Sequence, residues 1–135
     1  MALEAKQDVE QLADQFTRNA DETHTRLIRA IEKNEISQED ARVMFQHETS
    51  LRQQANSLYI DAAKCVVEGL ALSQEKLVAV IDEASERIAT IAKIAAFLDL
   101  VADILALATA AYAAKPKPIL AALKEVQADL KALKA

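Results

Sequence analysis

Glycine, proline, cysteine and aromatic residues are all scarce in this chain of 135 residues. It contains one Gly, two Pro and no Trp, and aromatic residues make up 4% of it. Tight β-hairpin turns rely on Gly, Asn and Asp, so a sheet built from several hairpins is disfavoured. Ala, Leu, Glu, Lys and Gln, which are strong helix formers, are abundant instead. We therefore expect an all-α protein.

The same shortages exclude several classes of function. The single cysteine, Cys65, excludes an internal disulfide and a zinc site made of several Cys ligands. A net charge of −5 and few aromatic residues argue against nucleic-acid binding, which needs a basic face or stacking platforms. Residues 1–16 are charged and amphipathic, unlike a cleaved signal peptide. We expect a cytoplasmic protein, with export by a route that uses no cleaved signal left open.

Apolar residues recur at helical spacing along most of the chain, and short polar segments separate them. The pattern predicts four helices, at about residues 3–33, 38–70, 74–114 and 118–133. Ser37 and Ser73 are placed to cap the second and third helices, and the Lys-Pro-Lys-Pro segment at 115–118 ends the third. We expect residues 1–135 to form one domain, an elongated antiparallel bundle of three long helices plus a short C-terminal helix with coiled-coil-like packing.

The most apolar stretch, Ile88–Ala114, raises the question of a membrane span. As one helix it would extend about 40 Å, enough to cross a bilayer. On a helical wheel it has a broad apolar face and a narrow alanine strip that carries Asp99 and Asp103. Each aspartate would cost about 2.5–3.5 kcal/mol at the bilayer centre, which disfavours a stable transmembrane helix. The pattern favours the core helix of a soluble bundle, but a segment released at a membrane would look the same.

Five charged residues are candidates for buried or interhelix charge. If the third helix folds back near residues 70–73, Asp99 and Asp103 come level with three arginines of the first two helices: Arg26, Arg29 and Arg42. Two aspartates four residues apart on a helix repel each other, so a counter-charge or solvent exposure is expected. The alternative is that both aspartates simply face solvent.

Motifs for catalysis or metal binding are weak. His24 and His47 are the only histidines, and Met44 stands where a di-metal bundle would need a second Glu ahead of His47. A chain with one Gly also offers no Gly-rich loop to hold a phosphate or an oxyanion. We expect no enzyme, and we predict no catalytic residue, no cofactor and no metal ion.

An apolar surface that the predicted bundle leaves uncovered indicates a binding function. The predicted bundle cannot cover the broad apolar face at the far end of the third helix, and exposed apolar patches usually mark an interface. The interaction residues predicted there are Phe97, Val101, Ile104, Leu105, Leu107 and Tyr112. We expect a non-catalytic protein–protein interaction module of the inhibitor or immunity, secretion-chaperone or adaptor type. Its partner would be another protein or a second copy, giving a homo-oligomer.

A lipid surface is the alternative partner. In this hypothesis the third and fourth predicted helices open as a hairpin around residues 115–118, and the lysines of the fourth face anionic headgroups.

Overall fold

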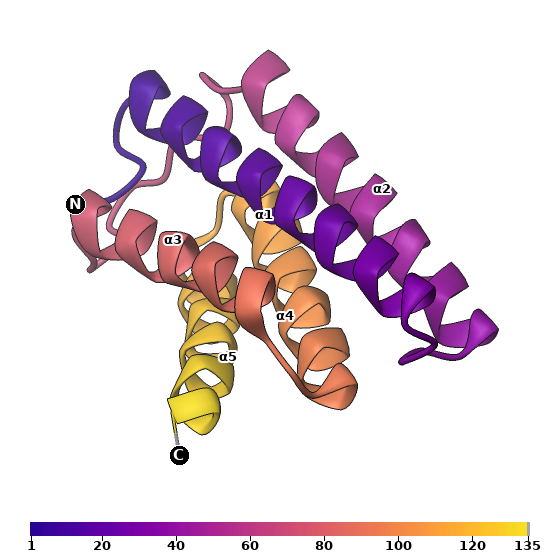
Figure 1. Cartoon of the computed structure of the whole chain (residues 1–135). Coiled ribbons are helices and arrows are strands. Elements are labelled where there is room, and N and C mark those ends of the chain that lie inside the picture. Colours follow the sequence, from indigo (N-terminus) through magenta and orange to yellow (C-terminus); the bar gives the residue numbers. More distant parts are fainter. Residues whose placement is uncertain (135) are drawn as a thin grey trace.

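The computed structural model describes residues 1–134, and its regular structure is entirely helical (Figure 1). The all-α prediction is confirmed, although the helices number five within these residues rather than four. They are α1 (Lys6–Glu32), α2 (Gln38–Ile60), α3 (Gln74–Thr90), α4 (Ile94–Ala113) and α5 (Pro116–Lys134). All five contribute buried apolar side chains to one core cluster.

The helices form two layers, which follow from the contacts between them. In the first layer α1 lies between α2 and α3, and in the second α4 and α5 form a hairpin, with α4 against α2 and α5 against α3 (Figure 1). α3 runs parallel to α1, since Gln74 Nε2 donates to Asp8 O (3.0 Å) at the start and Arg29 Nη2 donates to Ala89 O (2.9 Å) near the end. α1 therefore contacts both other helices of its layer along its length.

The predicted second helix is too long. α2 ends at Ile60, and a non-helical connection follows up to Ser73. The connection begins with a turn in which Cys65 N donates to Asp61 O (3.1 Å), and it then pairs with the N-terminus: Val67 N donates to Leu3 O (2.8 Å), and Ala2 N donates to Leu72 O (2.6 Å). The pairing with the N-terminus replaces helix hydrogen bonds beyond residue 65. Four apolar residues of this connection, Ala62, Cys65, Val67 and Leu70, are buried although they are not helical.

The predicted third helix, 74–114, is two helices. α3 ends at Thr90, Ile91 and Lys93 adopt extended backbone angles, and α4 starts at Ile94. Two guanidinium groups of α1 stabilise the break: Arg26 Nε donates to Ile91 O (2.9 Å), and Arg29 donates to Ala89 O. Cationic donors satisfy the carbonyls that a helix end leaves unpaired. The break therefore comes from α1, because residues 91–93 contain neither Gly nor Pro.

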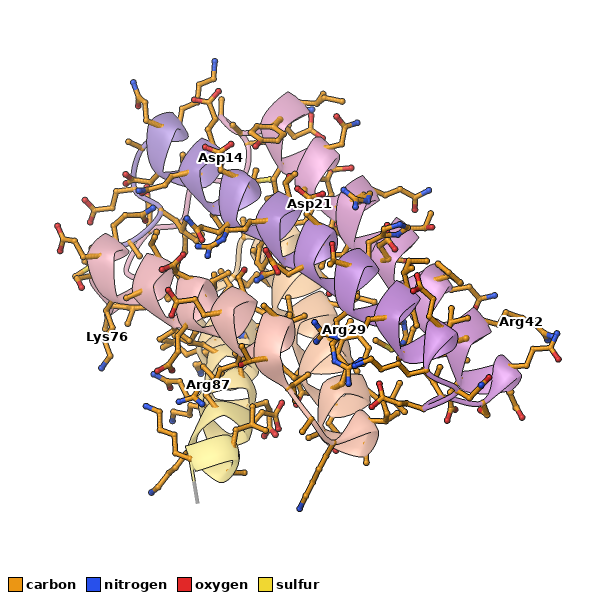
Figure 2. All side chains as sticks on the ribbon, viewed as in Figure 1. Asp14, Asp21, Arg29, Arg42, Lys76 and Arg87 are labelled. Carbon is orange, nitrogen blue, oxygen red and sulfur yellow. The ribbon has the colours of Figure 1, made fainter. Side chains whose placement is uncertain are left out.

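These contacts also correct the predicted counter-charges. Arg26 is buried, pairs with Glu35 (3.3 Å) and lies over the ring of Phe97 (5.7 Å from Cζ to the centroid). Arg42 projects outward from the exposed side of α2, near the α1–α2 turn (Figure 2). Within residues 1–134 neither Asp99 nor Asp103 forms an ion pair. Arg26 is thus a buried charge as predicted, and Asp99 is exposed, as in the alternative prediction. The predicted pairing of the arginines with the two aspartates is wrong, because it assumed an unbroken third helix.

The turn between α4 and α5 is shorter than predicted, since α5 begins at Pro116 rather than at 118. Ala114 caps α4 in the left-handed conformation (φ 58°). The first helical N–H groups have no partner within a helix, so the first turn of α5 accommodates both Pro116 and Pro118. The result is a tight antiparallel hairpin.

Candidate functional site

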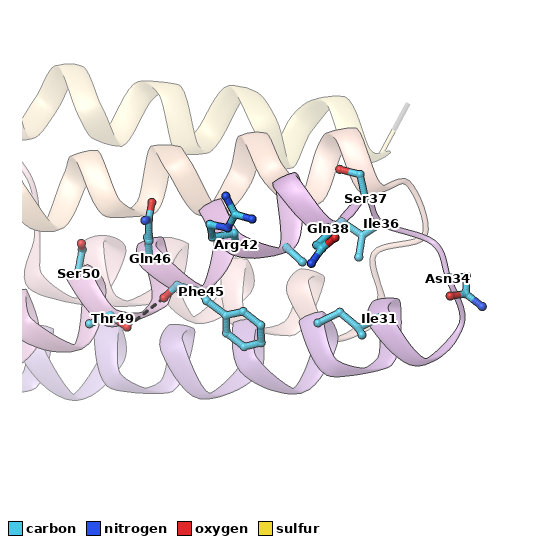
Figure 3. Close-up of a pocket in the computed structure, with 11 residues that line it drawn as sticks. Ile31, Asn34, Ile36, Ser37, Gln38, Arg42, Phe45, Gln46, Thr49 and Ser50 are labelled. Atoms are coloured by element: carbon cyan, nitrogen blue, oxygen red, sulfur yellow. Dashed lines mark hydrogen bonds between the residues drawn. The ribbon is translucent and has the colours of Figure 1, made fainter.

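A wide groove lies at the end of the α1–α2 hairpin (Figure 3). Its volume is about 1010 Å³, and it runs along one side of α2 from the turn at residues 33–37. Eleven residues line it: Ile31, Asn34, Ile36, Ser37, Gln38, Ala41, Arg42, Phe45, Gln46, Thr49 and Ser50. We take this groove as the candidate functional site.

Local sequence shapes the end of the groove at the α1–α2 turn. Asn34 adopts the left-handed conformation (φ 56°), Asn34 N donates to Ile31 O (3.1 Å) and Glu35 N donates to Ala30 O (2.9 Å). This is the Schellman pattern that ends helices, and Asn tolerates it better than most side chains. Ser37 then caps α2 as predicted, accepting a hydrogen bond from Asp40 N (3.0 Å). The chain thus reverses within five residues and brings Ile31 and Ile36 into the groove.

Apolar side chains on the two helices flank the groove. Ile31 at the end of α1 and Phe45 on α2 are each 38% exposed, and Ile36 packs partly against the core. Figure 3 shows Ile31 and the Phe45 ring pointing into the same space between α1 and α2. Ala41 is short, so it leaves room between them. These residues form an apolar floor that other elements of the described chain leave open to solvent.

Polar side chains form the other side of the groove. Gln38, Arg42, Gln46 and Ser50 stand four residues apart, so they follow one row along α2. Arg42 is the only charged residue among the eleven that line the groove. It forms no ion pair with any residue of the described range 1–134. The groove therefore offers one guanidinium, several neutral hydrogen-bonding groups and an apolar floor.

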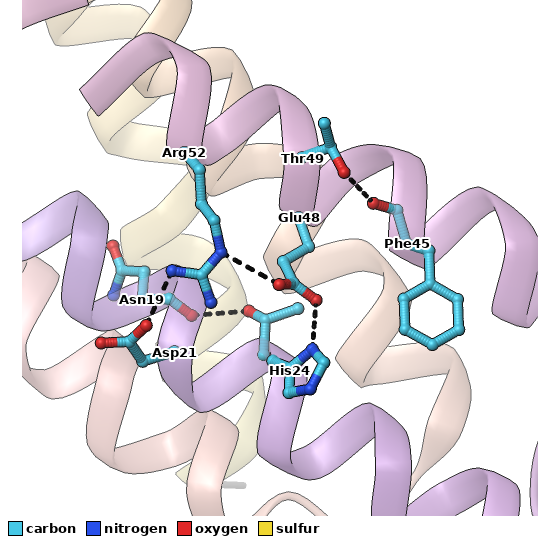
Figure 4. A network of polar contacts seen from close by, with 8 residues as sticks. Asn19, Asp21, His24, Phe45, Glu48, Thr49 and Arg52 are labelled. Atoms are coloured by element: carbon cyan, nitrogen blue, oxygen red, sulfur yellow. Dashed lines mark hydrogen bonds and ion pairs between the residues drawn. The ribbon is translucent and has the colours of Figure 1, made fainter. Parts of the chain in front are cut away.

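A polar network joins α1 to α2 beside the Phe45 ring (Figure 4). Arg52 donates to Asp21 (2.7 Å) and to Glu48 (3.0 Å), and Glu48 also contacts His24 Nδ1 at 2.8 Å. The hydrogen bond to Asp21 is the largest cause that raises the pKa of Arg52 above its ordinary value. The His24 ring lies 6.3 Å from the Phe45 ring in a tilted arrangement. This network holds the two helices together and supports one wall of the groove.

A second unusual feature is a pair of carboxyl groups between α4 and α5. Burial raises the pKa of Asp129 to about 7, and the neighbouring carboxyl groups of Asp103, Asp99 and Glu125 raise it further. Within the described chain Asp129 Oδ2 is buried and has no hydrogen-bond partner. Asp103, for which a counter-charge or solvent exposure was predicted, therefore lies beside a second carboxyl group whose pKa is raised.

The predicted interaction surface on residues 97–112 is mostly buried. Phe97, Val101, Ile104 and Leu107 are at most 1% exposed, so the prediction that the bundle leaves them uncovered is wrong. α2 and α5 cover them, whereas the predicted bundle left that side open. Leu105 is partly buried. Tyr112 remains 40% exposed, and its hydroxyl donates to Asp61 (2.6 Å).

Sequence reasoning missed Ile31, Ile36 and Phe45 as site residues, although one signal was present. Met44 and Phe45 are adjacent, and neighbours on a helix point about 100° apart. Two such neighbours cannot both point into the same core. In the structure Met44 is the buried one, and Phe45 faces the groove.

Comparison with known protein families, curated proteins and solved structures finds no significant match for this chain. Among the described residues, α4 is the one helix long and apolar enough to cross a membrane. A single helix of this kind is a weak indication, because core helices of soluble proteins have the same length and composition.

Proposed function

We propose that this protein is a non-catalytic protein–protein interaction module that binds its partner in the groove at the α1–α2 turn. The observation that carries the proposal is the open apolar floor made by Ile31, Ile36 and Phe45. Exposed apolar patches framed by polar residues are typical of interaction sites. The inhibitor or immunity, secretion-chaperone and adaptor roles all require a surface of this type.

The chemistry of the groove supports a binding role rather than catalysis. The eleven lining residues, all within the described chain, include no Asp, Glu, His, Cys or Lys. General acid–base catalysis relies mainly on these residue types. The hydroxyl groups of Ser37, Thr49 and Ser50 therefore lack an activating base within the groove.

The proposal can be tested by selecting binders from a displayed library of random peptides. Peptides of about 16 residues would span about 24 Å as a helix. We expect the wild-type protein to enrich peptides that Phe45→Ser and Ile31→Ser no longer retain. Ile60→Ser is the matched control, because Ile60 is 73% exposed at the opposite end of the same helix. Circular dichroism verifies that each variant is folded. Enrichment that is indifferent to Phe45 and Ile31 would contradict the proposal.

Light scattering after size-exclusion chromatography separates a foreign partner from a second copy. If the groove binds a second copy, the wild-type protein is a dimer that Phe45→Ser dissociates and Ile60→Ser does not. If the partner is another protein, the wild-type protein and both variants are monomers.

A membrane-active protein is the second candidate, and the observation that favours it is α4. This helix has the length and composition of a span, and α5 follows it in a tight hairpin. Protonation of the carboxyl groups between the two helices would lower the cost of entering lipid. Flotation with vesicles of phosphatidylcholine and phosphatidylglycerol, at about pH 7.5 and about pH 5, tests it. We expect binding at the lower pH, and no binding at either pH would exclude this candidate.

A further inference from the structure

We infer that the groove binds an amphipathic helix of a partner protein that presents a carboxylate to Arg42. This inference rests on the proposed function and names the chemistry of the partner. Three properties of the groove carry it: its length along α2, the position of its apolar residues and its single charge.

The groove has the length and direction of a short helix. Its polar row extends from Gln38 to Ser50, which is about 18 Å at 1.5 Å per residue. A partner helix of about 12 residues spans the same distance. Residues spaced four apart form the ridges that pack into the grooves of a neighbouring helix. The row from Gln38 to Ser50 is such a ridge, so a helix can lie beside it.

The apolar floor requires a partner with an apolar stripe. Ile31, Ile36 and Phe45 come from the end of α1, the turn and α2, and all three line the same groove. A helix that binds in a groove anchors itself with apolar residues at positions i, i+3 or i+4, and i+7. Such a stripe would cover the Phe45 ring and the Ile31 side chain, which are exposed in the isolated chain.

The charge of the groove selects a carboxylate. The chain has a net charge of −5, yet the only charged residue in the groove is the cation Arg42. The acidic residues of the first turn of α2, Glu39 and Asp40, do not line the groove. A guanidinium binds a carboxylate through two parallel hydrogen bonds. Gln46 and Ser50 continue the row beyond Arg42 with neutral groups that bond to the polar edge of the partner.

The peptide library is also the probe for this inference. Peptides enriched by the wild-type protein and lost on Phe45→Ser are aligned by their apolar stripe. We expect Asp or Glu to be enriched at one position beside that stripe. Selection on Arg42→Gln should remove this preference, whereas selection on Lys76→Gln should keep it. Lys76 is exposed at the start of α3, far from Arg42 (Figure 2), so it is a matched change of charge.

One selected peptide then gives the size of the effect. Replacing its acidic residue by Gln or Asn should weaken binding to the wild-type protein about fivefold, as for an exposed ion pair of about 1 kcal/mol. The same replacement should leave the affinity for Arg42→Gln unchanged. Fluorescence anisotropy with a dye-labelled peptide measures both differences.

The outcomes separate the inference from the function on which it rests. Phe45-dependent peptides without a preferred acidic position would overturn the inference and leave the proposed function standing. A dimer that Phe45→Ser dissociates would also overturn it, because the occupant would be a second copy. If no enriched peptide depends on Phe45, both the proposed function and the inference are wrong.

Discussion

The α1–α2 turn and the α4–α5 hairpin both carry apolar residues at helical spacing, but they use them differently. α4 is the most apolar helix of the described chain, yet its large side chains Phe97, Val101 and Ile104 are buried. α2 is more polar, yet Val43, Phe45 and Ile60 are 38–73% exposed. The difference arises because α4 packs against neighbours on several sides, while the outer side of α2 has none. Apolar composition alone therefore does not locate an exposed apolar surface.

The largest expected effect separates the two phenylalanines. Phe97→Ala removes a side chain that is fully buried, and we expect it to lower the free energy of unfolding by about 3–5 kcal/mol. Phe45→Ala removes one that is 38% exposed, with an expected loss of about 1 kcal/mol. Urea denaturation of both variants measures the difference. Equal losses would mean that the two rings are buried to a similar extent, contrary to the difference between α4 and α2 described above.

Arg26→Gln tests how the α3–α4 break depends on α1. Arg26 is 3% exposed, and the change leaves the carbonyl of Ile91 without its donor and Glu35 without its cation. We expect a loss of about 2–3 kcal/mol. Hydrogen exchange should become faster at residues 91–97, where α4 begins. Arg29→Gln is the milder comparison, because Arg29 is only half-buried. Unchanged exchange in that segment would show that the break forms without Arg26.

The pH dependence of stability tests the carboxyl pair of the α4–α5 hairpin. Asp129 has a pKa of about 7 in the folded chain, above the value of about 4 of an unfolded aspartate. The folded state therefore holds one more proton between about pH 4 and pH 7, so stability falls as the pH rises and levels off above about pH 7. Because solvent screens the carboxyl pair, we expect the free energy of unfolding to fall by about 1–2 kcal/mol in total over this pH range.

Asp129→Asn should remove this fall. The measurement is the free energy of unfolding from about pH 4 to pH 8 for the wild-type protein and the variant, since other carboxylates cancel in the difference. Glu68→Gln, at an exposed position of the connection before α3, is the control and should keep the wild-type slope. If the free energy of unfolding of Asp129→Asn still falls with rising pH, another titrating group causes the fall.

The smallest effect on stability is expected for Arg42→Gln. Arg42 is exposed and forms no ion pair within residues 1–134, so the free energy of unfolding should change by less than about 0.5 kcal/mol. Thermal denaturation beside Lys76→Gln measures this. A larger loss would give Arg42 a structural role and would weaken its assignment as a binding residue.

Part of the fold was predictable, and the errors have definite causes. Ser37 and Ser73 cap α2 and α3 as predicted, because a cap depends on neighbouring residues alone. The end of α2 at Ile60 was not predictable, since residues 2 and 3 supply the backbone partners of the following connection. At the candidate site the sequence pointed to Arg42, but as a counter-charge for Asp99 and Asp103 rather than as part of a groove.

By itself the amino-acid sequence determined that the protein is all-α, where α2 and α3 begin and where the Lys-Pro-Lys-Pro segment separates the last two helices. These properties depend on backbone propensity, caps and turns, which are local. Only the tertiary structure decided that the apolar stretch Ile88–Ala114 breaks at Ile91–Lys93 and that Phe45 stays exposed. Both depend on side chains distant in sequence: Arg26 and Arg29 bind the end of α3, and no helix of the described chain covers the outer side of α2.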